Sequence, residues 1–161
     1  MDLSKLSTGD KVIGVSGVLL LIFSFFPWLG FSIGGFSESR SAWTFTLCWL
    51  AVILGVALVV LVVMKMQGVA LPTLGSVTWN QIALGIATVA AIFILIKIIT
   101  GPGTNGVDIS GTGIDKERKI GIFLGFAASI GLVVGAFLNV KEADELPKKS
   151  TGGTPPAPPA A

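Results

Sequence analysis

Long apolar segments separated by short polar ones dominate the hydropathy pattern of this chain. They predict four membrane-spanning helices, over residues 12–29, 44–64, 82–100 and 120–138. The last segment has nineteen residues and no charge, and as a helix it is roughly 28 Å long, close to the thickness of a bilayer's hydrocarbon core. We therefore expect an all-α membrane protein, a four-transmembrane-helix bundle whose helices run up, down, up and down.

Small residues gather on one face of the fourth segment. On a helical wheel, five of them lie within about 120° of one another: Gly121, Gly125, Ala128, Gly131 and Gly135. Such a seam lets a neighbouring helix approach closely in lipid. The third segment offers a matching face of Ala83, Ala87 and Ala91. We expect these two faces to pack against each other within the chain, and to dock a partner only as a second use.

Polar segments flank the expected helices. Residues 1–11 form an N-terminal juxtamembrane segment, and the apolar run that follows has no small-x-small cleavage site, so we expect it to remain as the first membrane helix. Residues 141–161 form a Pro/Ala-rich tail without apolar periodicity, which predicts disorder. Its Pro-Pro-Ala-Pro-Pro stretch is alternatively a docking ligand.

Two of the loops alternate apolar and polar residues. Residues 31–37 do so around Gly34-Gly35, which indicates either a short β-hairpin or a Gly/Ser loop whose phenylalanines dip into the headgroups. Residues 107–110 alternate as well, and pairing with the first loop is one possibility. In the same loop Asp115 suits the N-cap of the fourth helix, with Glu117 in its first turn.

Signals at the helix ends suggest where the membrane surface lies. Tryptophan is enriched at both membrane–water interfaces, so we expect interface anchors at Trp28, Trp43 and Trp79. Lys97 lies three residues from the end of its segment, and a lysine there reaches the interface with its ammonium group. Thr78 and Gln81 have the spacing of a capping box for the third helix.

Composition narrows the chemistry. The chain is 52% hydrophobic and only 12% charged, with a mean hydropathy of +0.87. It has no histidine, no tyrosine and a single cysteine, Cys48, so we expect no catalytic residues, no cofactor and no metal site. A net charge of +2 is too small to indicate nucleic acid as a partner.

The numbers of basic residues on the two sides of the expected spans are almost equal, so they give little indication of how the protein is oriented in the membrane. With the N-terminus inside, the inner basic residues are Lys5, Lys11, Lys65, Lys141, Lys148 and Lys149, and the outer ones are Arg40, Lys97, Lys116, Arg118 and Lys119. The first helix usually dominates orientation, and two lysines precede it against one arginine after it. We therefore expect a multi-pass protein of the cell membrane with both termini in the cytoplasm.

A family resemblance accompanies these patterns. The opening Leu-Ser-x-Gly-Asp-Lys-Val, the apolar run ending Phe-x-Phe-Phe-Pro-Trp-Leu-Gly, the Arg-Lys-Ile-Gly start of the fourth segment and the Pro/Ala-rich tail resemble a group of small four-helix membrane proteins of actinobacteria. The resemblance covers most of residues 6–140. It implies location and topology, and it brings no functional residues.

Three function classes follow from these observations. A non-enzymatic scaffold or accessory subunit that acts through helix packing fits the small-residue faces, with the lipid bilayer and another membrane protein or a second copy as partners. A small oligomeric transporter or channel would need polar groups at mid-membrane, where these segments offer only hydroxyls. An enzyme acting on lipid-linked substrates would need a base or nucleophile, and the third loop offers only Asp108, Asp115 and Glu117.

Overall fold

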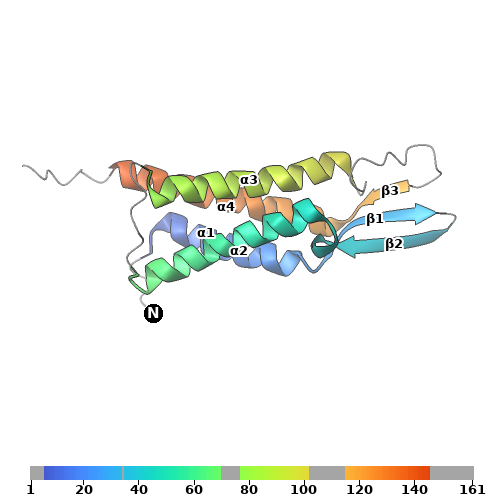
Figure 1. Cartoon of the computed structure of the whole chain (residues 1–161), viewed down its shortest axis with the longest axis horizontal. Helices are drawn as coiled ribbons and strands as arrows, with labels where there is room; N and C mark the ends of the chain where they lie inside the picture. Colours follow the sequence, from blue (N-terminus) through green and yellow to red (C-terminus); the bar gives the residue numbers. More distant parts are fainter. Residues whose placement is uncertain (1–5, 34, 70–76, 102–114, 146–161) are drawn as a thin grey trace, which may run out of the picture.

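The computed structural model describes residues 6–33, 35–69, 77–101 and 115–145. Its four helices are α1 (Thr8–Phe23), α2 (Thr46–Met66), α3 (Trp79–Thr100) and α4 (Ile120–Glu145). Its strands are β1 (Pro27–Ile33), β2 (Phe36–Ser41) and β3 (Asp115–Arg118), and a 3-10 turn, η2 (Ala42–Thr44), leads into α2. The helices lie side by side along the long axis, and the sheet extends from one end of the bundle (Figure 1).

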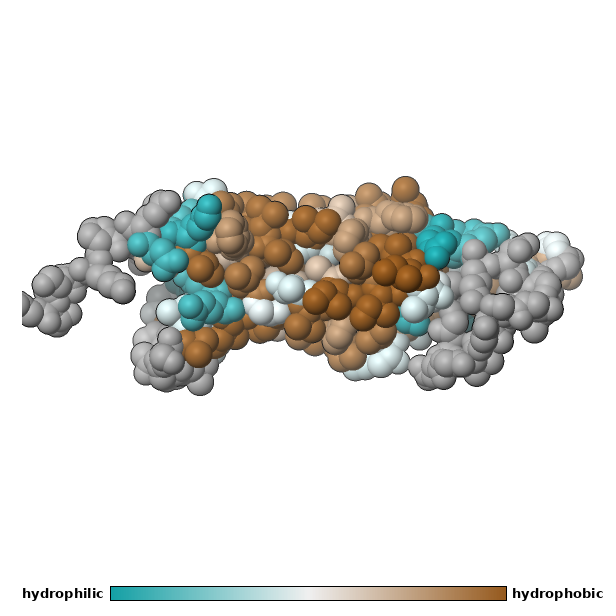
Figure 2. Space-filling model, turned by 90° about the horizontal axis from the view of Figure 1, so that it is seen from above, coloured by the Kyte–Doolittle hydropathy of each residue, from teal (hydrophilic) through white to brown (hydrophobic). Residues whose placement is uncertain are grey.

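Within the described residues, three helices are long and apolar enough to cross a membrane: α2, α3 and α4. Exposed valine, leucine, isoleucine and phenylalanine side chains cover the outside of the bundle. On the face shown in Figure 2, a hydrophobic band occupies the middle of the molecule and hydrophilic residues lie at both ends. This distribution matches a bilayer core between two polar surfaces.

The first helix is shorter than the sequence predicts. It ends at Phe23 instead of residue 29, and Pro27, which lies inside the expected span 12–29, begins a strand. The Ser24 hydroxyl donates a hydrogen bond back to the Leu21 carbonyl over 2.6 Å. Because a residue before proline is disfavoured in the helical conformation, Phe26 cannot easily continue the helix.

A small antiparallel sheet corrects the all-α expectation. Its strand order is β2-β1-β3, so β1 lies in the middle. β1 and β2 form the hairpin that was one of two interpretations of the first loop, with Phe31 opposite Glu38. Gly35, with φ +90°, stands in the turn and adopts the backbone conformation that glycine tolerates best.

The third strand replaces the expected start of the fourth helix. Asp115 is not an N-cap, because residues 115–118 pair with β1 and place Leu29 opposite Arg118. The free edge of β1 supplies hydrogen-bond partners that an extra turn of helix would forgo. Residues 107–110, for which pairing with the first loop was one possibility, lie outside the described residues.

The boundaries of the other helices agree more closely. Thr78 and Gln81 form the expected capping box. The side chain of Ser7 caps α1 and accepts a hydrogen bond from the Asp10 backbone N–H over 3.0 Å. The fourth helix continues to Glu145, so the first five residues of the expected tail are helical. The remainder of the tail, residues 146–161, lies outside the described part of the chain.

The glycine seam of α4 packs within the chain, but against a different element than expected. The atoms nearest Gly121 and Gly125 belong to the segment 26–28, and those nearest Gly131 and Gly135 belong to α1. The expectation that the alanine face of α3 covers these glycines is therefore wrong. Of the other small residues, Ala83, Ala87 and Ala128 are buried and Ala91 is partly buried, while α3 packs on both α2 and α4.

Trp28 fills the space that the seam leaves at the sheet end of the bundle. Its side chain is fully buried, and its indole N–H donates to the Phe23 carbonyl over 2.7 Å. A Cβ added at Gly125 would lie 2.4 Å from the Trp28 ring. Trp28 is thus a core residue and not the interface anchor that its neighbourhood in the sequence suggests.

Hydrogen bonds join Arg118 and Lys119, at the end of β3, to α3 and to Trp28. The Lys119 backbone N–H donates to the Trp28 carbonyl over 2.9 Å. The Arg118 guanidinium donates to the Ile98 carbonyl over 2.6 Å and so satisfies a free carbonyl in the last turn of α3. The sheet therefore continues the bundle as one packed body.

Replacing Gly125 by leucine tests the seam. A side chain there must displace the Trp28 ring, and overpacking of a core costs about 1–3 kcal/mol. We expect Gly125→Leu to lower the thermal midpoint in detergent, followed by circular dichroism. Gly85→Leu is the matched control, since a Cβ at Gly85 meets nothing within 4 Å. A stable Gly125→Leu protein that has only lost association would instead make the seam a docking face.

Candidate functional site: an ion pair that joins four helices

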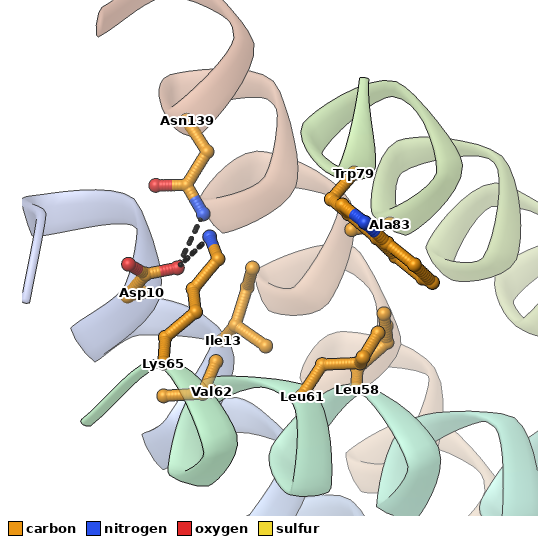
Figure 3. A pocket seen from close by; sticks show the side chains of 9 residues that line it. All are labelled: Asp10, Ile13, Leu58, Leu61, Val62, Lys65, Trp79, Ala83 and Asn139. Atoms are coloured by element: carbon orange, nitrogen blue, oxygen red, sulfur yellow. Dashed lines mark hydrogen bonds and ion pairs between the residues drawn. The ribbon is translucent and has the colours of Figure 1, made fainter. Parts of the chain in front are cut away.

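Asp10 is the most deeply buried charged residue in the described part of the chain. It lies in the first turn of α1 and is only 5% exposed. Its Oδ1 accepts hydrogen bonds from Lys65 Nζ of α2 over 3.0 Å and from Asn139 Nδ2 of α4 over 2.7 Å (Figure 3). A single carboxylate thus connects three helices.

Asn80 brings the fourth helix into the same network. Its Oδ1 accepts from Lys65 Nζ over 3.2 Å, and its Nδ2 donates to the Asn139 carbonyl over 3.0 Å. The Ser7 hydroxyl, which caps α1, donates to Asn139 Oδ1. We call the four residues Asp10, Lys65, Asn80 and Asn139 the polar clasp. Each helix of the bundle contributes one of them.

The first turn of α1 lies unusually close to α4 at this point. A Cβ added at Gly9 would lie 2.2 Å from Asn139 Oδ1 and 2.4 Å from the Gly135 carbonyl oxygen. Gly9 and Gly135 therefore let the two backbones approach until Asn139 reaches Asp10. The small residues and the clasp depend on each other.

The hydrogen bonds of the clasp offset the cost of burying its charges. Removing a charge from water is expensive, and attraction between partners repays this only when the remaining hydrogen-bonding groups are also satisfied. Within the described residues, every buried side-chain nitrogen or oxygen atom has a hydrogen-bond partner. The Lys65 side chain is 31% exposed and the Asp10 side chain only 7%, so the carboxylate is the more deeply buried partner.

Two cavities adjoin the clasp on opposite sides. Inside the bundle, Asp10, Ile13, Leu58, Trp79 and Ala83 help to line a space of about 10 Å³, which is room for about one water molecule. Toward the end of the bundle, a more open pocket of about 140 Å³ includes Ser7 and Glu142 besides the clasp. Both are smaller than the pockets of about 300–1,000 Å³ that usually hold small molecules.

The arrangement of the site suits clamping better than bond-breaking chemistry. The Asp10 carboxylate already accepts hydrogen bonds from two side chains. The Ser7 hydroxyl donates its proton to the amide oxygen of Asn139, which is not a base that could activate a nucleophile. Among the described residues, no three His, Cys, Asp or Glu side chains are grouped so that they could hold a metal ion. What the clasp does physically is fix the register of four helices.

The three remaining expected anchors lie near the ends of the helices. Trp43 is 43% exposed, and its indole N–H donates to Ser24 Oγ over 3.1 Å. The Lys97 ammonium lies 5.5 Å from the centre of the Phe45 ring, within the range of a cation–π contact. Trp79 lies at the end of the bundle that carries the clasp. It is partly buried and lines the inner cavity beside the clasp.

The sequence-based expectations missed the clasp, although a signal for it exists. Those expectations gave Asp10, Asn80 and Asn139 no part in a contact between helices. In the sequence, residues 10 and 80 stand two positions before an expected span, and residues 65 and 139 stand directly after one. In an up-and-down bundle these positions meet at one end, and the carboxylate, ammonium and amide groups there complement one another.

A second charged pair lies at the far end, in the sheet. Lys119 hydrogen-bonds to Glu117 and places its positive charge beside it, and Ser32 Oγ donates over 3.2 Å, so the pKa of Glu117 is held below its usual value. A lowered carboxyl pKa stabilises the fold above the ordinary glutamate pKa, and this contribution is lost as the pH falls through the lowered value.

Comparison with known proteins adds no family. Neither models of protein families nor the sequences of curated proteins match this chain.

Replacing Lys65 tests whether the clasp is held by its ion pair. Lys65→Met leaves the Asp10 carboxylate buried beside amide groups alone, and breaking a buried ion pair costs about 3 kcal/mol or more. We expect the free energy of unfolding, measured by steric trapping in bicelles, to fall by about this amount. The double variant Asp10→Leu/Lys65→Met should recover most of the loss, because no charge is then left unpaired. Additive losses in the double variant would contradict the pairing.

Proposed function

We propose that this chain is a non-enzymatic integral membrane protein with four spans that acts as a scaffold or accessory subunit of a membrane assembly. The observation that carries the proposal is the clasp. Its polar groups are used in bonds between the helices of one chain, which favours a rigid bundle over a site that binds and releases a substrate.

We place α1 in the membrane as the fourth span. As a helix of 16 residues it is roughly 24 Å long, which is shorter than a typical hydrocarbon core. Two observations support its insertion: α1 packs along α4, and beyond Lys11 its exposed side chains are apolar, namely Val15, Val18, Leu19 and Ile22. The exposed residues Phe25 and Phe26 extend the apolar surface beyond its last turn.

In this proposal the sheet projects outside the cell and both termini lie in the cytoplasm of the cell membrane. Trp43 and Lys97 then mark the outer headgroup level. An impermeant thiol reagent should label Ser37→Cys in whole cells, in a Cys48→Ala background, whereas Ala143→Cys should react only after permeabilisation. The reverse pattern would overturn the orientation. Ser37 and Ala143 are both exposed, so access differs only by the membrane.

The two alternative functions have less support. A transporter would have to break the clasp or open another path, and the hydroxyls of Thr88 and Ser129 bond to carbonyls of their own helices. An enzyme would need an activated group, whereas Glu117 is paired with Lys119. A partner that uses the rigid bundle as a platform needs neither feature.

Crosslinking in native membranes tests the scaffold proposal. We expect a lipid-permeable crosslinker, followed by identification of the products, to capture one recurring membrane protein or a second copy of the chain. The same complex should survive as a discrete species in nanodiscs. A strictly monomeric protein that captures nothing reproducibly in either setting would contradict the proposal. Gly125→Leu is an informative comparison, because it perturbs the packing inside the bundle while leaving its outer surface unchanged.

A further inference from the structure

Two apolar grooves lie on either side of Val15 on the outer face of α1. The first, of about 280 Å³, lies between α1 and α2 and is lined mainly by apolar residues, among them Gly14, Val18, Val59, Val62, Val63 and Met66. The second, of about 270 Å³, includes Val12, Val15 and Ser16. The Val15 side chain, 63% exposed, forms the ridge between them.

Lys11 lines both grooves at the end nearest the clasp. Its side chain is exposed, and within the described residues its ammonium group has no acidic partner. The other charged residue of the first groove, Asp10, is already paired with Lys65 over 3.0 Å. Among the described residues, the shared end of the two grooves therefore carries one positive charge without an acidic partner.

From this geometry we infer a binding site for an anionic phospholipid with two acyl chains. The phosphate would contact Lys11 at the headgroup level, and one acyl chain would lie in each groove beside Val15. The positive charge complements the phosphate, and the paired grooves complement the two chains of a glycerolipid. From Lys11 the helix rises about 10 Å to Val18 in the first groove and about 7.5 Å to Ser16 in the second, which accommodates the upper part of each chain. The inference rests on the proposed membrane insertion of α1.

Gly14 forms part of the floor of the first groove. A Cβ added there meets no atom within 4 Å, so a larger residue would occupy the groove without disturbing the packing of the bundle. Gly85 on α3 has the same open surroundings but lines neither groove. The two glycines provide a matched pair of substitutions.

Native mass spectrometry of the full chain, released from nanodiscs with equal amounts of phosphatidylglycerol and phosphatidylcholine, tests the site. We expect the wild type to retain phosphatidylglycerol preferentially. Lys11→Gln should lower that retention about five-fold, the factor that one basic residue contributes at an anionic surface. Lys141→Gln is the control, since Lys141 lies at the same end of the bundle over the Phe137 ring. Gly14→Leu should reduce retention, whereas Gly85→Leu should not.

Equal retention of the two lipids by the wild type would overturn the inference. So would equal losses in the two lysine variants, or wild-type retention in Gly14→Leu. Circular dichroism of each variant confirms that the bundle is intact. A protein that inserts and captures its partner but shows no lipid preference would leave the scaffold proposal standing and remove only this site. A protein that does not insert would remove both.

Discussion

The pairing of Asp10 with Lys65 is the interaction on which the arrangement of the helices depends most. A carboxylate that is 5% exposed cannot remain charged in an apolar bundle without partners. Its partners come from α2 and α4, and Lys65 in turn donates to Asn80 of α3, so the ion pair and its amide partners join four helices at one end. Apolar side chains alone, which pack equally well against lipid tails, would not fix this register.

At the opposite end, the helices are held by the close packing of Trp28 against the glycine seam of α4. Because α1 ends at Phe23, the chain turns back toward α4, and the Trp28 side chain packs on the glycine seam. The same short segment begins β1, which then pairs with both of its neighbours. A glycine seam in a membrane helix is usually explained by a second helix. Here Gly121 and Gly125 pack against the indole ring of Trp28 instead of a helix. Because Trp28 belongs to β1, this contact also attaches the small sheet to the bundle.

Much of the helical architecture could be predicted from the sequence, because apolar length and capping residues are local signals. The positions of α2 and α3 and the apolar span of α4 follow from such signals. The short α1, the burial of Trp28 and the strand at residues 115–118 could not, since each depends on contacts between distant segments. The clasp falls between these cases: its residues stand at corresponding ends of the expected spans, yet only the fold brings Asp10 and Asn139 into contact.

Magic-angle-spinning NMR of the protein in bilayers, with ¹⁵N-labelled lysine and ¹³C-labelled aspartate, tests the central ion pair most directly. The 3.0 Å separation of Lys65 Nζ and Asp10 Oδ1 predicts strong polarisation transfer between the Lys65 ammonium nitrogen and the Asp10 carboxyl carbon, and its loss in Lys65→Met. No transfer in the folded wild-type protein, with an Asp10 carboxyl signal typical of a solvated side chain, would contradict the account.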